Sequence, residues 1–298
     1  RGINFFDTAN VYSRGRSEEI LGRLIAGERD ELVINSKVFG RMGDDVNAAG
    51  LSRRHIVRAV EDSLRRLGTD RIDFYFVHQF DRTTAIEETL AALDDLVGRG
   101  LILYPAVSNW AAWQIAKAIG ISSREHLARF ELVQPMYSLV KRQAEVEILP
   151  LALEERLGVI PYSPLGAGLL TGRYGSGDGD AGGVVSGVES GGTGGRLVEN
   201  EMYAERYGDG AYYRTAERFV AYARNAGVHP ATLAVAWVAS HPAVSAPIIG
   251  ASRREQLEPS LAALEYNMSA QERQAIGELS PEPPPPTDRS EETAARRR

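Results

Sequence analysis

Short runs of hydrophobic residues alternate along the chain with longer segments in which apolar positions recur every three or four residues. The first pattern predicts buried strands, and the second predicts amphipathic helices. Strands are predicted at Ile3–Asp7, Leu32–Lys37, Ile72–His78, Leu101–Ser108, Phe130–Gln134, Val159–Tyr162 and Val244–Gly250. Helices are predicted at Ser17–Leu24, 53–67, 84–98, Ala111–Ala118, Val146–Leu157, Tyr212–Asn225, Pro230–Ser240, Arg254–Leu264 and Ala270–Leu279.

Capping signals set several of these boundaries. Ser17 and Ser52 stand where N-caps are expected, and Thr84 with Glu87 three residues later has the spacing of a capping box. Gly68 follows the predicted end of the second helix, where a left-handed residue commonly terminates a helix.

Strands that alternate with helices predict parallel strands joined by crossovers, in seven βα units. An open doubly wound sheet would satisfy this order, but a (β/α)₈ TIM barrel is favoured. In a barrel the carboxyl ends of the strands form one face, which is where active sites lie. Polar residues recur at those ends: Asp7, Lys37, His78, Asn109, Gln134, Ser163 and Ser252. A barrel needs an eighth unit, and because the chain opens directly on a strand we expect the first unit to be missing.

Composition narrows the function classes. The chain has 298 residues, 43% hydrophobic and 25% charged, with a net charge of −6, which argues against nucleic acid as the main partner. It contains 0 cysteines, which excludes disulfides and thiolate chemistry, and no carboxylate–histidine spacing predicts a metal site. No apolar run approaches the ~20 residues that span a bilayer, and no secretory signal opens the chain. We therefore expect a cytoplasmic protein without a membrane partner, of undetermined oligomeric state.

Two segments interrupt the alternating pattern. Residues 1–279 are predicted to form the barrel, and residues 280–298 a disordered tail that is rich in proline and then in charge. The glycine-rich stretch Gly175–Gly195 is either a lid over a cofactor or an insertion without a function.

Asp7, Lys37 and His78 end three successive predicted strands. Because adjacent strands lie about 4.8 Å apart, the three side chains are expected to converge. Lysine is rare in this chain, with only Lys117 and Lys141 besides Lys37, so a lysine at the end of a buried strand is conspicuous. The alternative is a structural ion pair between Asp7 and Lys37, but buried pairs of that kind are costly.

Tyr12 follows Asp7 by five residues, in the loop after the first strand. A phenol has a pKa of about 10, and a nearby lysine cation lowers that value. With Asp7 orienting Lys37 and with His78 binding a substrate oxygen or relaying a proton, this set suits proton donation to a carbonyl oxygen. Taken alone, a loop tyrosine is more commonly a packing residue.

Two loops have the composition of phosphate sites. Tyr162–Tyr174 is rich in glycine, which lets backbone amides approach a phosphate, and it includes Arg173. Ile249–Arg254 ends the last predicted strand and opens a helix, whose N-terminus attracts anions. Phosphate groups in barrels bind frequently after strands seven and eight. The alternative is turn glycines and solvated arginines.

From Arg1 to about Leu279 the chain resembles the aldo-keto reductases, NADPH-dependent (β/α)₈ enzymes, and most of all the bacterial branch that is similar to the potassium-channel β subunits. The matching motifs are Phe6-Asp7-Thr8-Ala9-Asn10-Val11-Tyr12 with Ser17-Glu18, Ser36-Lys37, Val77-His78, Val107-Ser108-Asn109, Val133-Gln134-Pro135, Tyr162-Ser163-Pro164-Leu165 and Ile249-Gly250-Ala251-Ser252.

The resemblance implies a catalytic tetrad in which Tyr12 is the acid, Lys37 tunes its pKa, Asp7 pairs with Lys37, and His78 orients the substrate. It also implies an NADP(H) site. The nicotinamide residues would be Ser108, Asn109, Gln134 and the stacking Tyr162, beside Asp7; the pyrophosphate residues would be Ser163, Pro164, Leu165, Gly168 and Arg173; and the adenosine 2′-phosphate residues would be Gly250, Ser252, Arg253 and Gln256.

Two features depart from the family pattern. Pro259 and Ser260 stand where the family often has a Glu-Asn pair that contacts adenine. The family's N-terminal hairpin and first βα unit have no counterpart in the sequence, which predicts exposed strand edges in a fragment or a chain with a misassigned start.

The expected function is NADP(H)-dependent reduction of aldehydes or ketones to alcohols. Trp110 is expected beside the substrate. Trp113 either lines the same pocket or belongs to the core. Three alternatives stay open: a Schiff-base lyase in which Lys37 attacks a carbonyl, an NADPH-sensing regulatory subunit with slow turnover, and an incomplete barrel that binds nothing. The identity of the carbonyl substrate is not predicted.

Overall fold

The computed structural model describes residues 1–174, 197 and 200–287, in two compact units. Unit 1 consists of Arg1–Gln134 with Leu151–Gly158, and unit 2 of Pro135–Pro150 with Val159–Arg298. The glycine-rich stretch 175–195, which is the predicted lid, and residues 288–298 of the predicted tail lie outside the described residues.

Unit 1 is built on a parallel sheet whose strands follow one another in chain order, as in a βα barrel. Its strands are β1 (Phe5–Asp7), β2 (Val33–Val38), β3 (Ile72–Val77), β4 (Ile102–Ser108) and β5 (Leu132–Gln134). The sixth strand in the order is β6 (Gly158–Val159), where the Gly158 amide donates to the Glu131 carbonyl at 2.9 Å.

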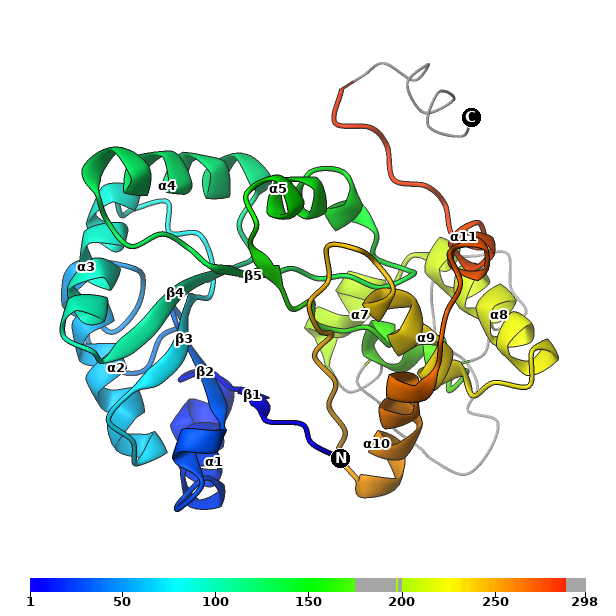
Figure 1. Ribbon diagram of the computed structural model, residues 1–298, viewed down its shortest axis with the longest axis horizontal. Coiled ribbons are helices and arrows are strands. Elements are labelled where there is room, and N and C mark those ends of the chain that lie inside the picture. Colours follow the sequence, from blue (N-terminus) through cyan, green and yellow to red (C-terminus); the bar gives the residue numbers. More distant parts are fainter. Residues whose placement is uncertain (175–196, 198–199, 288–298) are drawn as a thin grey trace. The chain divides into compact units, whose positions relative to one another are not determined.

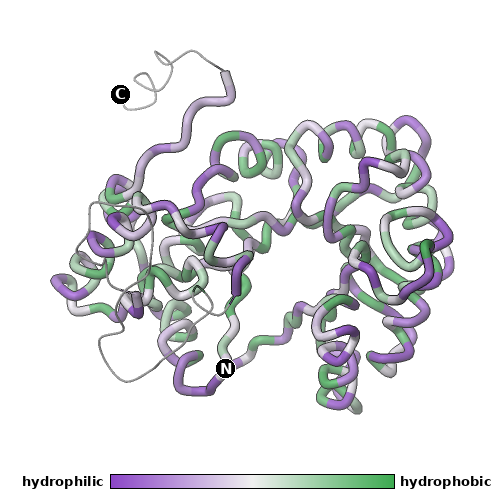
Figure 2. Tube along the Cα trace, turned by 180° about the vertical axis from the view of Figure 1, so that it is seen from behind, coloured by the Kyte–Doolittle hydropathy of each residue, from purple (hydrophilic) through white to green (hydrophobic). Residues whose placement is uncertain are grey.

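The helices of unit 1 cover one side of this sheet, as Figure 1 shows for α2 and α3. They are α1 (Arg16–Leu24), α2 (Arg53–Leu67), α3 (Ile86–Gly98) and α4 (Ala112–Glu125), with the short turns η1 (Tyr12–Gly15) and η2 (Arg29–Glu31). Helix α5 (Ile148–Glu154) has residues in both units. Hydrophobic and hydrophilic positions alternate along them in Figure 2, as expected of amphipathic helices. The buried apolar residues of α2 therefore pack against β2, and those of α3 against β4.

Two predicted caps are wrong. Helix α1 begins after Gly15, and the hydroxyl of Ser17 accepts a hydrogen bond from Thr8 Oγ1 at 2.8 Å instead of capping the helix. Helix α3 begins after Ala85, because the hydroxyl of Thr84 donates to the Asp81 carboxylate at 2.9 Å. In both places another side chain binds the hydroxyl that the spacing assigns to the helix end: Thr8, nine residues before Ser17, and Asp81, three residues before Thr84.

Strand β1 is present as predicted, but it is not buried. Phe5 is half-buried, and Phe6 and Ile3 are exposed. Among the described residues β1 pairs only with β2, so one edge of the strand lacks the neighbour that an interior strand has.

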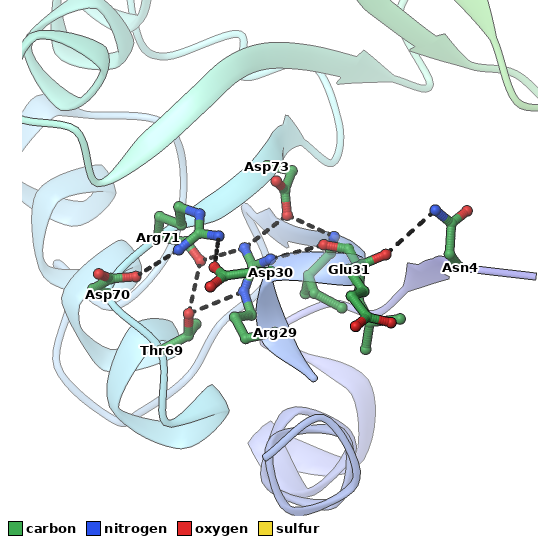
Figure 3. Close-up of polar contacts among 10 residues, drawn as sticks. Asn4, Arg29, Asp30, Glu31, Thr69, Asp70, Arg71 and Asp73 are labelled. Atoms are coloured by element: carbon green, nitrogen blue, oxygen red, sulfur yellow. Dashed lines mark hydrogen bonds and ion pairs between the residues drawn. The ribbon is translucent and has the colours of Figure 1, made fainter. Parts of the chain in front are cut away.

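A polar cluster joins the segments at the amino ends of β2 and β3 (Figure 3). Arg29 donates to Thr69 Oγ1 at 3.0 Å, to the Arg71 carbonyl at 2.9 Å and to Asp73 Oδ2 at 2.7 Å. The same carboxylate oxygen accepts the Ile34 amide of β2 at 2.8 Å. Because active sites of barrels lie at the opposite, carboxyl ends of the strands, we interpret this cluster as structural.

Unit 2 consists of helices around a core that contains Trp237 and Phe219. They are α7 (Glu201–Tyr207), α8 (Gly210–Asn225), α9 (Pro230–Ala239), α10 (Arg254–Leu261) and α11 (Ala270–Gly277), with the turns η3 (Gln143–Glu145), η4 (Gly166–Thr171) and η5 (Ala262–Glu265). The sequence patterns predicted four of these helices and missed α7.

The predicted strand Val244–Gly250 is not a strand, so six strands rather than seven are found in the described part of the chain. The segment still follows residues 159–161: the Ser245 amide donates to the Val159 carbonyl at 2.8 Å, and the Ile248 amide to the Pro161 carbonyl at 2.9 Å. Pro161 and Pro247 lack the amide protons that would extend this pairing into a regular ladder.

Among the described residues, no helix combines the length and the apolar composition that a bilayer crossing requires.

Candidate active site

A buried lysine forms the centre of the site in unit 1. Lys37 has 0% of its surface exposed, and its ammonium donates to Asp7 Oδ2 at 2.6 Å and to the Thr8 carbonyl at 2.7 Å. Burial lowers the pKa of Lys37, while the negative charges of Asp7 and Glu18 act in the opposite direction. The positive charge of Lys37 therefore depends on the negative charges of the Asp7 and Glu18 carboxylates.

The strand register explains why these groups meet. Asp7 lies opposite Asn35 in β2, and Lys37 lies opposite Phe76 in β3. Because side chains alternate between the two faces of a strand, Asp7, Asn35 and Lys37 all point to the face opposite α2 and α3. The convergence expected from the sequence is thus present.

Tyr12 begins the η1 turn directly after β1, and its side chain is 39% exposed. The Lys37 ammonium lies 5.1 Å from the centroid of the Tyr12 ring, and the His78 ring meets the Tyr12 ring edge-on with centroids 5.8 Å apart. Ser13 and Arg14 have φ angles of 49° and 52°, so the turn is held in a conformation that non-glycine residues rarely adopt. An accessible phenol thus lies beside a buried cation and an imidazole.

His78 follows β3 and is largely withdrawn from solvent. The pKa of His78 is lowered to about 4, mainly by burial and to a smaller extent by the positive charge of Lys37. The negative charge of Asp7 opposes this shift. The imidazole is therefore neutral at pH 7 and can both donate and accept a hydrogen bond.

Three polar side chains at the ends of β4 and β5 adjoin the Asp7–Lys37 pair. Gln134 Nε2 donates to Asp7 Oδ1 at 2.9 Å, and Ser108 Oγ donates to the Gln134 carbonyl at 2.9 Å. Asn109, with a left-handed φ of 58°, donates through Nδ2 to the His78 carbonyl at 2.9 Å and to Ser108 Oγ at 3.0 Å. Hydrogen bonds thus connect three of the four predicted nicotinamide residues to one another, to Asp7 and to the backbone of His78.

Trp110 lies in an aromatic cluster of unit 1. It is 4% exposed, and its ring meets Phe80 at 4.9 Å and Phe130 at 5.5 Å between centroids. Trp113 is 61% exposed, so the interpretation of Trp113 as a core residue is wrong. Trp113 lies on the solvent-facing side of α4.

The predicted pyrophosphate residues belong to unit 2, in and before η4. Ser163, Gly166, Ala167 and Gly168 all have positive φ angles, and the Gly168 amide donates to the Leu165 carbonyl at 3.0 Å. Pro164 and Leu165 connect these residues. Ser163 is hydrogen-bonded with Tyr207, and burial raises the pKa of the Tyr162 phenol.

The predicted adenosine residues also belong to unit 2. Ser252 Oγ donates to Gln256 Oε1 at 2.9 Å, and Arg253 is the N-cap residue of α10. Gly250, Ser252, Arg253 and Gln256 are all exposed, and Arg173 precedes the segment that is not described. Pro259 lies inside α10, and its carbonyl accepts the Thr232 hydroxyl at 2.6 Å.

The sequence patterns assigned no role to two carboxylates that support the site. Glu18, in α1, is fully buried and pairs with Arg66 at 2.6 Å. In the sequence it stands out only as part of a family motif. Asp81 accepts the Leu51 amide at 2.8 Å and the Thr83 amide at 2.8 Å, joining the loop after β2 to the loop after β3. A glutamate on the buried side of an amphipathic helix was the available signal for Glu18.

Comparison with known families supports what the geometry suggests. The model of the Aldo/keto reductase family matches residues 1–281. The chain belongs to the aldo/keto reductase family. Its relatives confirm the expected branch: it is 36% identical over 268 residues to the "Probable voltage-gated potassium channel subunit beta" of Arabidopsis thaliana, covering 89% of this chain and 78% of that protein.

Two further relatives carry names of oxidoreductases. The chain is 32% identical over 293 residues to "Uncharacterized oxidoreductase YrpG" of Bacillus subtilis, covering 95% of this chain and 84% of that protein. It is 32% identical over 298 residues to "Versiconal hemiacetal acetate reductase" of Aspergillus parasiticus, covering 93% of this chain and 83% of that protein. Family membership thus implies an oxidoreductase of the aldo/keto reductase type.

Proposed function

We propose that the protein reduces aldehydes or ketones to alcohols with NADP(H), and that Tyr12 is the general acid. The observation that carries this proposal is the Lys37 ammonium, paired with Asp7 at 2.6 Å and lying 5.1 Å from the ring of Tyr12. We also propose that the parallel sheet is part of a (β/α)₈ barrel, because its strands follow in chain order.

The residues near the tetrad suit a nicotinamide cofactor. Its carboxamide and ribose need hydroxyl and amide partners, and Ser108, Asn109 and Gln134 supply these groups beside Asp7. In unit 2, the glycines of the segment 163–168 and the N-terminus of α10 with Arg253 have the chemistry of phosphate sites. When bound, the cofactor would supply the hydride for carbonyl reduction.

Lys37 gives Tyr12 its proposed role. A phenol with a pKa near 10 is a weak acid at neutral pH, and a cation beside it stabilises the phenolate that remains after proton donation. Asp7 and the Thr8 carbonyl fix the position of the ammonium through two hydrogen bonds. The proton would pass from Tyr12 to the carbonyl oxygen as negative charge develops there.

His78 would orient the substrate. Because its imidazole is neutral, it can donate a hydrogen bond to the carbonyl oxygen without itself introducing a charge. Its ring lies against Tyr12, so both groups can reach the same oxygen. We also propose that Trp110, which directly follows Asn109, lies near the substrate.

The Schiff-base alternative is disfavoured by the same geometry. A lysine nucleophile must be neutral and must reach its carbonyl, but Lys37 has 0% exposure and two hydrogen-bonded partners. Borohydride treatment with a carbonyl compound should leave Lys37 unmodified.

The test of the proposed function is a titration with NADPH, followed by nicotinamide fluorescence, with NADH in parallel and then a screen of aldehydes and ketones. We expect NADPH to bind more tightly than NADH and at least one carbonyl to be reduced. Absence of NADPH binding would contradict the proposal.

The relatives named as potassium-channel β subunits favour a second candidate, a nucleotide-binding regulatory subunit with slow turnover. The two candidates differ in rate. Tight NADPH binding with a single slow turnover on every carbonyl tested would favour the regulatory subunit, whereas repeated turnover would favour the reductase.

A further inference from the structure

Glu18 has an unusual environment for a glutamate. Its side chain is completely withdrawn from solvent, and both carboxylate oxygens are occupied: Oε1 accepts the hydroxyl of Ser36, and Oε2 accepts Arg66 Nε at 2.6 Å. These partners come from β2 and α2, so one carboxylate of α1 binds two other elements of unit 1. Burying a charge in this way is costly and calls for an explanation beyond simple packing.

The two attachments of Glu18 lead directly to the catalytic groups. Ser36 is the neighbour of Lys37 in β2, with its side chain on the opposite face of the strand. Helix α1 begins immediately after η1, the turn that opens with Tyr12. Glu18 therefore connects the segment that carries Tyr12 to the strand that carries Lys37.

Further contacts fix the same segment. The side chain of Arg66 lies on the backbone of Gly15, where an added Cβ would come within 2.7 Å of Arg66 Cδ. Thr8 Oγ1 donates to Ser17 Oγ at 2.8 Å. The turn between Tyr12 and Gly15 is thus held from both ends, and its left-handed residues need such support.

The charge of Glu18 has a second consequence. Lys37 has lost its hydration, so the ammonium depends on nearby negative charge. Asp7 supplies it on one face of β2, and Glu18 supplies it on the other. Burial lowers the pKa of Lys37, and the charges of Asp7 and Glu18 oppose this effect.

Building on the proposed function, we propose that Glu18 is a positioning residue of the active site: through Ser36 and Arg66 it fixes the Tyr12 turn against β2, and its negative charge helps to keep Lys37 protonated. A structural ion pair alone would hold the helix but would not affect the protonation of Lys37.

The decisive variant is Glu18→Gln, which keeps the size of the side chain and removes its charge. The chain contains only three lysines, so protein labelled with ¹³C- and ¹⁵N-lysine gives few signals, and Lys117 and Lys141 serve as internal references. We expect the pKa of Lys37 to fall by about 0.5 unit or more while those of the references stay unchanged. The matched control is Glu19→Gln, an exposed glutamate of the same helix.

A second variant tests the anchoring part with a smaller change. Ser36→Ala removes the hydroxyl but keeps the charge of Glu18. The Tyr12 and Arg14 amides donate to the Ala9 and Val11 carbonyls, and we expect their hydrogen exchange to become about five- to tenfold faster. Ser122→Ala, in α4, is the control and should leave the exchange of these amides unchanged.

These measurements need neither cofactor nor carbonyl substrate, so they separate this proposal from the proposed function. A Lys37 pKa in Glu18→Gln equal to that of the parent protein would overturn the electrostatic role. If Glu18→Gln fails to fold, the exchange rates of Ser36→Ala decide, and unchanged rates at Tyr12 and Arg14 would overturn the anchoring role.

In an active enzyme, the alkaline limb of the pH profile of kcat should also move to lower pH in Glu18→Gln but not in Glu19→Gln.

Discussion

Asp7 uses both of its carboxylate oxygens, accepting the Lys37 ammonium on Oδ2 at 2.6 Å and the Gln134 amide on Oδ1 at 2.9 Å. The carboxylate thus joins β1 to β2 through an ion pair and to β5 through a hydrogen bond from the neutral Gln134 amide. It thus orients both Lys37, the proposed partner of the general acid, and Gln134, a proposed cofactor residue.

Replacing Asp7 by asparagine should destabilise the protein because Lys37 would remain buried without its main counter-charge. Removing one partner of a buried pair costs about 3–5 kcal/mol, and we expect Asp7→Asn to lower the free energy of unfolding in urea by a similar amount. The double variant Asp7→Asn/Lys37→Met should recover much of the loss. A double variant no more stable than Asp7→Asn would show that the pair is not the source of the effect.

Tyr12→Phe should abolish turnover with little change in the Kd for NADPH. The substitution removes only the phenolic hydroxyl, which is the group proposed to donate the proton. The exposed position of the ring makes a large effect on folding unexpected. Steady-state kinetics and a fluorescence titration on the same preparation test both statements, and turnover equal to that of the parent protein would remove Tyr12 from this role.

Stability should depend on pH through His78. Its pKa is lowered to about 4, first by burial, whereas the unfolded chain has the ordinary value of 6.5. Between pH 6.5 and 4 the unfolded state binds a proton that the folded state does not, so the stability present above pH 6.5 is lost as the pH falls. The expected loss is up to about 3 kcal/mol.

The variant His78→Gln isolates this contribution. On going from pH 7 to pH 4, the free energy of unfolding of the parent should fall more than that of the variant, because the variant cannot be protonated at this position. His241 has a similarly low pKa of about 4 and remains in both proteins, so its effect cancels. His126→Gln, at an exposed position, is the control. Parallel pH curves for parent and His78→Gln would contradict the prediction.

The sequence was sufficient to predict how the tetrad comes together. Asp7, Lys37 and His78 follow apolar runs, and parallel strands bring their carboxyl ends to one edge whatever the details of packing. The residues also indicated Tyr12 as a weak candidate for the proton donor and two loops as phosphate sites, and the family resemblance then assigned the individual cofactor residues.

The failures arise where a side chain binds a partner other than the one its pattern suggests. Thr84 has the spacing of a cap, but Asp81, only three residues earlier, binds its hydroxyl within the same loop. Glu18 is a charged residue of a type usually found on the surface, yet its partner Arg66 lies 48 residues further along the chain. Nothing local encodes the pairing of Glu18, because it depends on how α2 packs against α1.

Gly22→Ala should destabilise the protein although alanine favours helices. An added Cβ at Gly22 would come within 2.6 Å of the Leu67 carbonyl oxygen, where α1 approaches the end of α2. Backbone atoms cannot move aside as a side chain can, so the expected cost is about 1–3 kcal/mol. Gly98→Ala is the matched control: no atom lies within 4 Å of its Cβ position in α3, and we expect a small gain of about 0.4–1 kcal/mol. Thermal unfolding of the two variants checks the difference in sign.

Arg29→Met should lower stability and leave turnover unchanged. The variant retains the aliphatic stem but loses the hydrogen bonds to Thr69, Arg71 and Asp73, and a bond to a charged group contributes about 1.5–3 kcal/mol. Because this cluster lies at the amino ends of the strands, away from Lys37, kcat and KM measured well below the unfolding temperature should match the parent values. Arg71→Met is the control, since its partner carboxylates Asp30 and Asp70 are exposed and such pairs contribute about 0–1 kcal/mol. A fall in kcat of Arg29→Met under folded conditions would show that the amino ends of the strands communicate with the site.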